Sequence, residues 1–185
     1  MLTLATAVRA LATEHSLRER PRVRVGPSSI VGAGLGVFAN VALPPNELLT
    51  FYPGDATLHW EEDANFAADA IIEGVPITFG RRVDDAGRAR LLQLLSSDAA
   101  LTLDVFPVNA RTSIVADPEL VDDAAYLSQY INDVRGPLCT DGRTANAEHT
   151  TLPDGCRVGT LTTRAVEVDE ELLVDYGEAY WDARR

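Results

Sequence analysis

Short apolar runs and alternating apolar and polar residues recur along this chain, a pattern typical of β-strands. Val23 and Val25 alternate with arginines, which predicts a half-buried strand. Further short strands are predicted at 47–52, 71–72, 75–79, 156–162 and 170–175. Turn signals lie between these runs, as at Pro53 and Gly54.

Three segments show helical spacing instead. Residues 3–20 carry apolar side chains on one face up to Pro21, which predicts an N-terminal amphipathic helix. Helices are also predicted at 86–95 and 123–131, and the Gly-, Asp- and Arg-rich stretch 133–145 indicates a loop. Many short strands with few helices predict a mainly β domain with a helical insert, an α+β fold.

Length and composition describe an ordinary globular domain. The 185 residues match one domain with a real core, and 46% hydrophobic and 24% charged residues are typical of soluble proteins. No apolar run approaches a membrane span, and residues 1–12 lack the features of a secretory signal. We therefore expect a soluble intracellular protein, cytoplasmic or nuclear.

The charge balance narrows the class of partner. A formal net charge of −12 argues against direct binding of nucleic-acid phosphates and suits a basic protein or peptide, although solubility alone also explains it. All 16 basic residues are arginine, so the chain has no lysine of its own. Cys139 and Cys156 are too few for a disulfide framework or a four-thiolate zinc site, and we expect free thiols.

The glycines of 32–36 suit a backbone that approaches a ligand closely. Gly32, Gly34 and Gly36 alternate with other residues between two strands. The spacing is not that of a dinucleotide-binding fingerprint, and no amphipathic helix follows it. Alone, the segment predicts a hairpin turn.

Together with later segments, this turn resembles the SET-domain family. SIVGAGLGVFA at 29–39, LPPNELL at 43–49 and FYPGD at 51–55 resemble the opening of a SET domain. YIND at 130–133 is similar to the family's F-I-N-H motif, with Asn146 as its second asparagine, and TRAVEVDEELLVDYG at 163–177 resembles its closing motif. The resemblance implies an N-terminal helix at 1–20, a SET domain at 21–181 with a variable insert at 57–125, and a tail at 182–185.

The family's fold and chemistry follow as expectations. Small curled sheets of the β-clip type would surround a C-terminal pseudoknot that brings Asn132 and Tyr176 together. The activity implied is methyl transfer from S-adenosyl-L-methionine to a lysine side chain, on a histone-like or ribosomal tail, with no metal. Because free lysine has a pKa of about 10.4, a dry channel and a nearby cationic sulfur would be needed to favour the neutral amine.

The resemblance also assigns roles residue by residue. The catalytic residues expected are Tyr176 and Tyr52, and the substrate-channel residues are Tyr52, Val174 and Tyr130. The cofactor-binding residues expected are Gly34, Leu35, Gly36, Asn132, Asp133, Tyr176 and Trp181. Trp181 suits either stacking on adenine or a C-terminal hydrophobic plug. Asn146 is expected to buttress the site, and Glu171 and Asp175 to supply supporting hydrogen bonds.

The chain also departs from the family pattern. Asp133 stands where the family has His, Gln129 replaces an Arg, and Val174 occupies a place where Phe or Tyr commonly limits the number of methyl groups. The cysteine cluster that closes many members with zinc is missing, so segment 178–185 or a partner subunit is expected to cover the channel. Some minimal members pair through their surfaces, which makes a homodimer one expectation.

Two other readings compete with an active enzyme. A degenerate SET domain would keep the fold as a protein-binding module, consistent with Asp133 and Gln129. A small β-rich interaction domain without a cofactor would make the motifs coincidental. His15, His59 and His149 are scattered singly, and we expect solvated or packed histidines rather than ligands.

Overall fold

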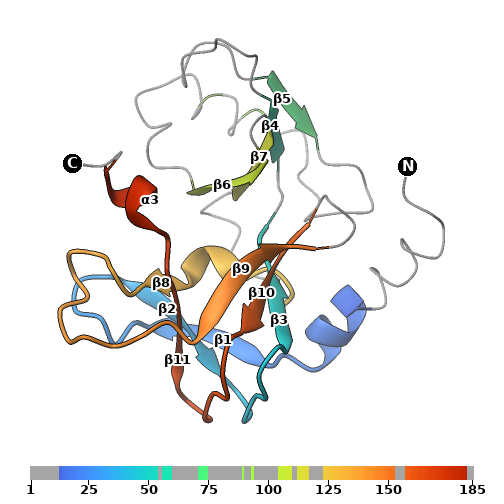
Figure 1. The fold of residues 1–185 in the computed structure, drawn as a ribbon. Coiled ribbons are helices and arrows are strands. Elements are labelled where there is room, and N and C mark those ends of the chain that lie inside the picture. The colour runs from blue at the N-terminus through green and yellow to red at the C-terminus, as the bar shows by residue number, and fades with distance from the viewer. Residues whose placement is uncertain are drawn as a thin grey trace.

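The structure is a computed structural model. It describes residues 13–53, 56–59, 71–74, 89, 93, 104–109, 112–116, 123–152 and 157–182. These residues form three small sheets and few helical segments, which confirms the mainly β, SET-like fold (Figure 1). Within them, no helix has the length and apolar character needed to cross a membrane.

The first sheet has the strand order β1-β2-β11-β8. Its strands are β1 (Val23–Pro27), β2 (Leu35–Ala39), β8 (Asn132–Asp133) and β11 (Glu171–Val174). The predicted glycine turn joins β1 to β2, and Gly32 and Gly34 take positive φ values of 84° and 76°, which glycine adopts without strain. The predicted strands at 23–25 and 170–175 are confirmed.

Strand β11 brings distant segments of the chain together. It pairs antiparallel with β2 at one end and parallel with β8 at the other. The loop that leaves β8 returns at Asn146, whose backbone N–H donates to Leu173 O at 3.0 Å. The C-terminal strand therefore lies beside β8 and beside the residue at which the loop after β8 returns.

A second sheet, β3-β10-β9, completes the body of the domain. It contains β3 (Leu48–Phe51), β9 (Ala147–Thr151) and β10 (Val158–Thr162), so the predicted strands at 47–52 and 156–162 are confirmed within the described residues. Apolar side chains from both sheets share the main core: Val23, Val37, Ala39, Leu43, Leu49, Leu127, Ile131, Ala147, Val166, Leu172 and Val174. Asp169, with a φ of 64°, turns the chain into β11.

The described part of the middle of the chain contains strands and two helical residues. A third sheet, β5-β4-β7-β6, occupies its described part. The strands are β4 (Ala56–His59), β5 (Ile71–Gly74), β6 (Asp104–Asn109) and β7 (Thr112–Ala116). Ala89 and Gln93 are helical, as the helix predicted at 86–95 requires, whereas the strand predicted at 75–79 lies outside the described residues.

The helix predicted at 123–131 is wrong except for one short turn. Only η2 (Ser128–Tyr130) is helical, and it is a 3₁₀ turn. Thr50 of β3 binds the backbone just before η2. Its hydroxyl donates to Ala125 O at 3.0 Å and accepts from Leu127 N at 2.8 Å. These tertiary hydrogen bonds compete with helical ones, so residues 125–127 are not helical.

The chain termini pack against this body at different places. Residues 13–19 are helical, and the rest of the helix predicted at 3–20 lies outside the described residues. Leu17 packs with Phe51 and Tyr126, and Arg18 pairs with Asp123 at 2.7 Å. At the other end, α3 (Glu178–Asp182) follows β11 on the side of β8 (Figure 1).

Candidate active site

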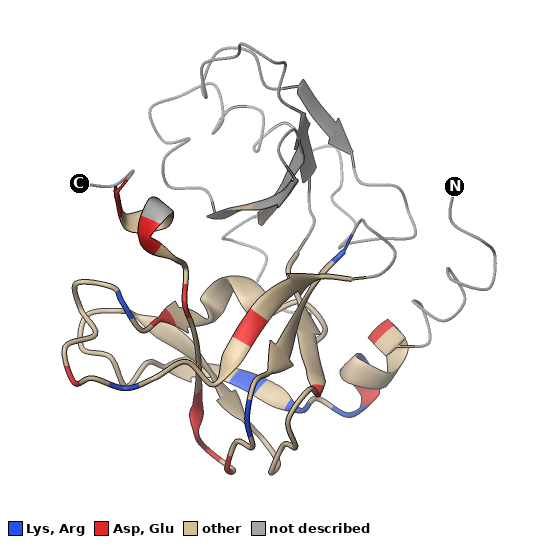
Figure 2. Cartoon of the chain, viewed as in Figure 1, with Lys and Arg blue, Asp and Glu red and all other residues tan. Residues whose placement is uncertain are grey.

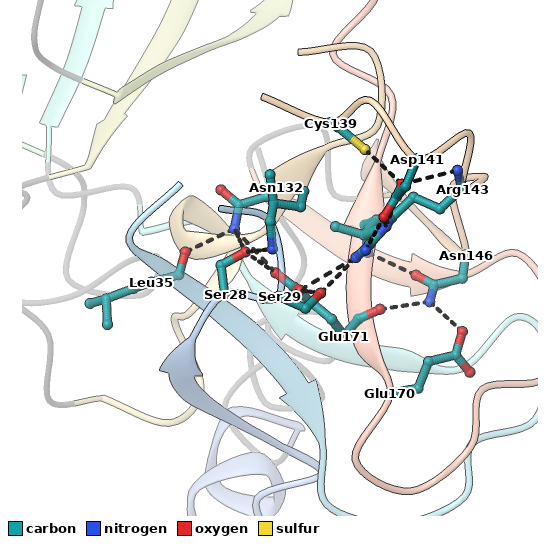
Figure 3. A network of polar contacts seen from close by, with 12 residues as sticks. Ser28, Ser29, Leu35, Asn132, Cys139, Asp141, Arg143, Asn146, Glu170 and Glu171 are labelled. Carbon is teal, nitrogen blue, oxygen red and sulfur yellow. Dashed lines mark hydrogen bonds and ion pairs between the residues drawn. The ribbon is translucent and has the colours of Figure 1, made fainter. Parts of the chain in front are cut away.

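The side chain of Asn132 is held by three acceptors at the start of β8. Its Nδ2 donates to Leu35 O at 2.8 Å, to Ser28 Oγ at 3.1 Å and to Glu171 Oε1 at 3.3 Å (Figure 3). A carbonyl and a carboxylate oxygen only accept hydrogen bonds, so the amide nitrogen must face them. The Oδ1 atom is then the end of Asn132 that remains to accept a hydrogen bond from a ligand.

Glu171 is the centre of this network. Ser28 Oγ donates to one carboxylate oxygen at 2.7 Å, and the Ser29 backbone N–H donates to the other at 2.8 Å. Burial alone would raise the pKa of Glu171, but the hydrogen bonds from Ser29, Ser28 and Asn132 outweigh it and lower the pKa below its usual value. Glu171 is therefore an ionised, structural acceptor, and not a proton donor.

Ser28, Ser29 and Arg143 were not among the residues expected at the site. The guanidinium of Arg143 reaches Ser29 Oγ at 2.6 Å and lies 3.9 Å from Glu171. It comes from the loop between β8 and β9, so this loop, the glycine turn and β11 are tied to one carboxylate (Figure 3). In the sequence, only their position as two adjacent hydroxyl residues before the glycine turn indicates that Ser28 and Ser29 could lie at the site.

Gly36 lies where no side chain fits. A Cβ at this position would overlap Glu171 Oε1 and would lie 3.3 Å from Asn132 Nδ2. At Gly34, by contrast, a Cβ would meet no atom within 4 Å, so the face of the turn there is open. Gly34 O already accepts from Ser28 N at 2.9 Å, and Leu35, with 45% of its surface exposed, uses its carbonyl to hold Asn132.

We expect Gly36→Ala to lower the free energy of unfolding by about 1–3 kcal/mol, because the methyl group must displace the buried Glu171 carboxylate. Urea unfolding of the variant measures this loss. Gly26→Ala is the matched control, since Gly26 pairs with Gly36 across β1 and β2 and its Cβ would contact only the Phe38 ring at 3.4 Å. Equal losses in the two variants would contradict the role given to Gly36.

Asn146 supports β11 from the other side. Its amide accepts from Leu173 N at 2.8 Å and donates to Glu171 O at 2.8 Å, and the residue is 1% exposed. A side chain thus satisfies the backbone of β11 where no neighbouring strand does. This is the geometry of a buttress, as expected for Asn146.

Tyr176 follows β11 and turns back toward β8. Its hydroxyl donates to Ile131 O at 2.6 Å, next to Asn132. Its backbone N–H donates to the Asp133 carboxylate, so both ends of the residue are fixed. The structure therefore brings Asn132, Asp133 and Tyr176 together, although the motifs that contain Asn132 and Tyr176 lie far apart in the sequence.

Trp181 on α3 lies against the same loop. Its Nε1 donates to Asp133 Oδ1 at 3.2 Å, and a Cβ at Gly136 would lie 2.9 Å from its ring. Tyr180 connects it to Tyr176 through ring contacts of 5.0 Å and 4.7 Å between centroids. Of the two roles expected for Trp181, this packing against Gly136 favours the plug.

Tyr52 belongs to a second aromatic group. Its ring contacts Phe106 at 5.5 Å and His149 at 6.1 Å between centroids, and it is 7% exposed. Tyr52 packs with Ile114 and Ala116 of β7 and with Val158 of β10, so the third sheet contacts the second sheet here. Val174 lies in the main core with 1% exposure, and Tyr130 packs against that core. The channel-lining roles of Tyr52, Tyr130 and Val174 stay predictions.

His149, expected to be solvated or packed and not a ligand, packs in the Tyr52 group. Its Nδ1 is 2.8 Å from Thr160 Oγ1, which is 2.5 Å from Ser128 Oγ. Desolvation by the surrounding protein lowers the pKa of His149 to about 4. The imidazole is therefore neutral near pH 7.

This pKa predicts a pH-dependent stability. With a pKa of about 6.5 in the unfolded chain, the unfolded state binds more protons than the folded state between pH 6.5 and 4, so stability falls as the pH falls. We expect His149 to contribute a loss of about 1–2 kcal/mol between pH 7.5 and 5. Urea unfolding at both pH values should show a smaller pH effect in His149→Asn, while His15→Gln, at an exposed site, keeps the full effect. Equal pH effects in the two variants would refute this assignment.

Two departures from the family pattern have defined surroundings. The Asp133 carboxylate is 6% exposed and accepts from three N–H groups, those of Arg135, Tyr176 and Trp181. Gln129 is 9% exposed, and neither atom of its amide has a hydrogen-bond partner among the described residues. Among all the residues that the structure describes, no three His, Cys, Asp or Glu side chains form a group that could hold a metal ion.

Comparison with known proteins agrees with this architecture. A family model described as the SET domain matches residues 34–177, which is more than half of the chain. The match runs from the glycine turn, through Asn132, to the residue after Tyr176. None of the curated proteins compared with the chain matches it. From the extent of the family match, the chain belongs to the SET-domain family.

Proposed function

We propose that this chain is a protein-lysine N-methyltransferase that uses S-adenosyl-L-methionine. One observation carries the proposal: Asn132 and Tyr176 meet where β8 lies beside β11, and the glycine turn is tied to the same point through Leu35. Members of the SET-domain family are generally protein-lysine methyltransferases. The geometry is that of one site assembled from three distant segments.

The residues present fit this cofactor. Since Asn132 Nδ2 is fully engaged, its Oδ1 is available for the α-ammonium group of an amino acid. The open face at Gly34 leaves room for a ligand against the turn. When bound, S-adenosyl-L-methionine supplies a methyl group on a cationic sulfur.

Tyr176 is the residue that we assign to the reacting centre. Its hydroxyl donates to Ile131 O, and a phenolic oxygen can also accept a hydrogen bond from an amine N–H or a weak one from a methyl C–H. The backbone bond to Asp133 removes motion at the other end of the residue. Its contribution is alignment, which can account for several orders of magnitude in rate.

The acidic surface supports a basic substrate. From Val166 to Asp182 the chain carries acidic residues and no basic one, and those that are exposed or half-buried are Glu167, Asp169, Glu170, Asp175, Glu178 and Asp182. Figure 2 shows these charges along β11, the turn before it and α3, beside the proposed site. Such a field speeds the approach of a cationic peptide, so we propose a lysine- and arginine-rich protein segment as the substrate.

Methyl transfer from radiolabelled S-adenosyl-L-methionine to core histones and ribosomal proteins tests the proposal. Labelled methyl-lysine in the hydrolysate is the expected result, and it must come from the added protein because this chain has no lysine. A chain that binds the cofactor but labels no protein in a whole-cell extract would instead be a binding module, the second candidate. That reading is favoured only by Asp133 and Gln129 in place of the family residues.

A further inference from the structure

The carboxylate of Asp133 joins three elements at the proposed site. Oδ2 accepts from the backbone N–H of Tyr176, and Oδ1 accepts from the backbone N–H of Arg135 and from the Trp181 indole at 3.2 Å. Both oxygens are therefore used inside the protein. The residue is only 6% exposed, so it has little surface left for a ligand.

A second layer of contacts holds the same segments together. Arg135 Nε lies 2.7 Å from Asp175 Oδ2, and its Nη1 lies 3.6 Å from Glu178. The other oxygen of Asp175 accepts from Gly177 N at 2.9 Å. The turn 133–136 thus contacts residues 175–181 along their length, from the residue before Tyr176 to the indole that packs on Gly136.

We propose that Asp133 is a positioning residue for the reaction and not a cofactor ligand. It fixes the backbone of Tyr176 and, through Trp181, holds α3 against the turn 133–136. Only a carboxylate suits this place, because a residue here must accept three hydrogen bonds with its two side-chain atoms and donate none. The family has His at this position, and a neutral imidazole has a single acceptor nitrogen, so it could not accept all three hydrogen bonds. Asp133 in its place therefore allows α3 to dock at the site through Trp181. The inference rests on the proposed methyl transfer.

Asp133→Asn tests it, because the shape is kept while one acceptor oxygen becomes a donor facing an N–H group. We expect kcat for methyl transfer to fall about 10–100-fold, while the dissociation constant of the cofactor changes by less than about threefold. Arg135→Gln, which removes only the outer ion pairs, should lower kcat less. Asp123→Asn is the control, since it makes the same exchange at a residue whose side chain pairs with Arg18 near the N-terminal end of the described chain.

Fluorescence gives a readout that does not need activity. The chain has two tryptophans, so Trp60→Phe leaves Trp181 as the only indole emitter. In that background Asp133→Asn should shift the emission of Trp181 and increase its quenching by acrylamide, at an unchanged urea midpoint for the rest of the fold. Unchanged emission, or a loss of cofactor affinity equal to the loss of kcat, would overturn the proposal. If the unsubstituted chain transfers no methyl group, the proposed function fails, and the fluorescence comparison still decides whether Asp133 holds Trp181.

Discussion

Tyr176→Phe is expected to lower the rate of methyl transfer by about 100-fold or more, with little change in cofactor affinity. The substitution removes the hydroxyl that donates to Ile131 O at 2.6 Å and, with it, the oxygen that we assign to the alignment of the amine. The ring packing against Tyr180 and the main core is kept, so the fold should persist. Single-turnover transfer with saturating cofactor and substrate measures the effect.

Tyr126→Phe is the matched control for this substitution. It removes a buried phenolic hydroxyl in the separate cluster formed with Leu17 and Phe51. Because this cluster has no contact with Tyr176 among those described, the rate should stay close to that of the unsubstituted chain. If Tyr176→Phe keeps the full rate, Tyr176 is a core tyrosine and has no part in the reaction.

Asn132→Asp is expected to weaken cofactor binding by about 100-fold or more. The change replaces the amide nitrogen, which donates to Leu35 O, Ser28 Oγ and Glu171, with an oxygen that cannot donate. The carboxylate introduced at position 132 also lies beside the Glu171 carboxylate, and the two negative charges repel each other at short range. The side chain must therefore move, and the acceptor that we assign to the cofactor moves with it. Calorimetric titration with S-adenosyl-L-methionine measures the loss.

The same exchange at Asn40 separates a local effect from a general one. Asn40 Nδ2 donates to Pro21 O at 3.0 Å in the turn after β2. We expect Asn40→Asp to leave cofactor affinity unchanged. Binding that survives in Asn132→Asp would mean that the amide of Asn132 does not contact the cofactor.

The alternation of apolar and polar residues and the order of the motifs predicted those strands whose own residues show the pattern. Val23 and Val25 mark β1 because every second residue must face the core, and the closing motif places β11 and Tyr176 by resemblance to the family. The strand β9 was missed, since residues 147–151 contain no apolar alternation and pair with β10 mainly through their backbone. The pattern at 125–127 is typical of a helix, but these residues are not helical because Thr50, far away in sequence, supplies hydrogen bonds to them.

The polar contacts of the site were the least predictable part. Asn132 and Tyr176 were expected from their motifs, but Ser28, Ser29 and Arg143 join the contacts of the site only because distant segments of the chain meet there. Arg143 reaches Ser29 across 114 positions of sequence, a contact that local spacing does not encode. Asp133 was expected to contact the cofactor, and its partners in the structure are N–H groups of the protein itself.

A crystal structure of the chain with S-adenosylhomocysteine, the product of the proposed reaction, tests the central claim most directly. The account predicts the α-ammonium group within about 3.2 Å of Asn132 Oδ1, the ligand along the open face of Gly34, and its sulfur facing the Tyr176 hydroxyl. A ligand bound elsewhere, or no binding at saturating concentration, would contradict a cofactor site at the junction of β8 and β11.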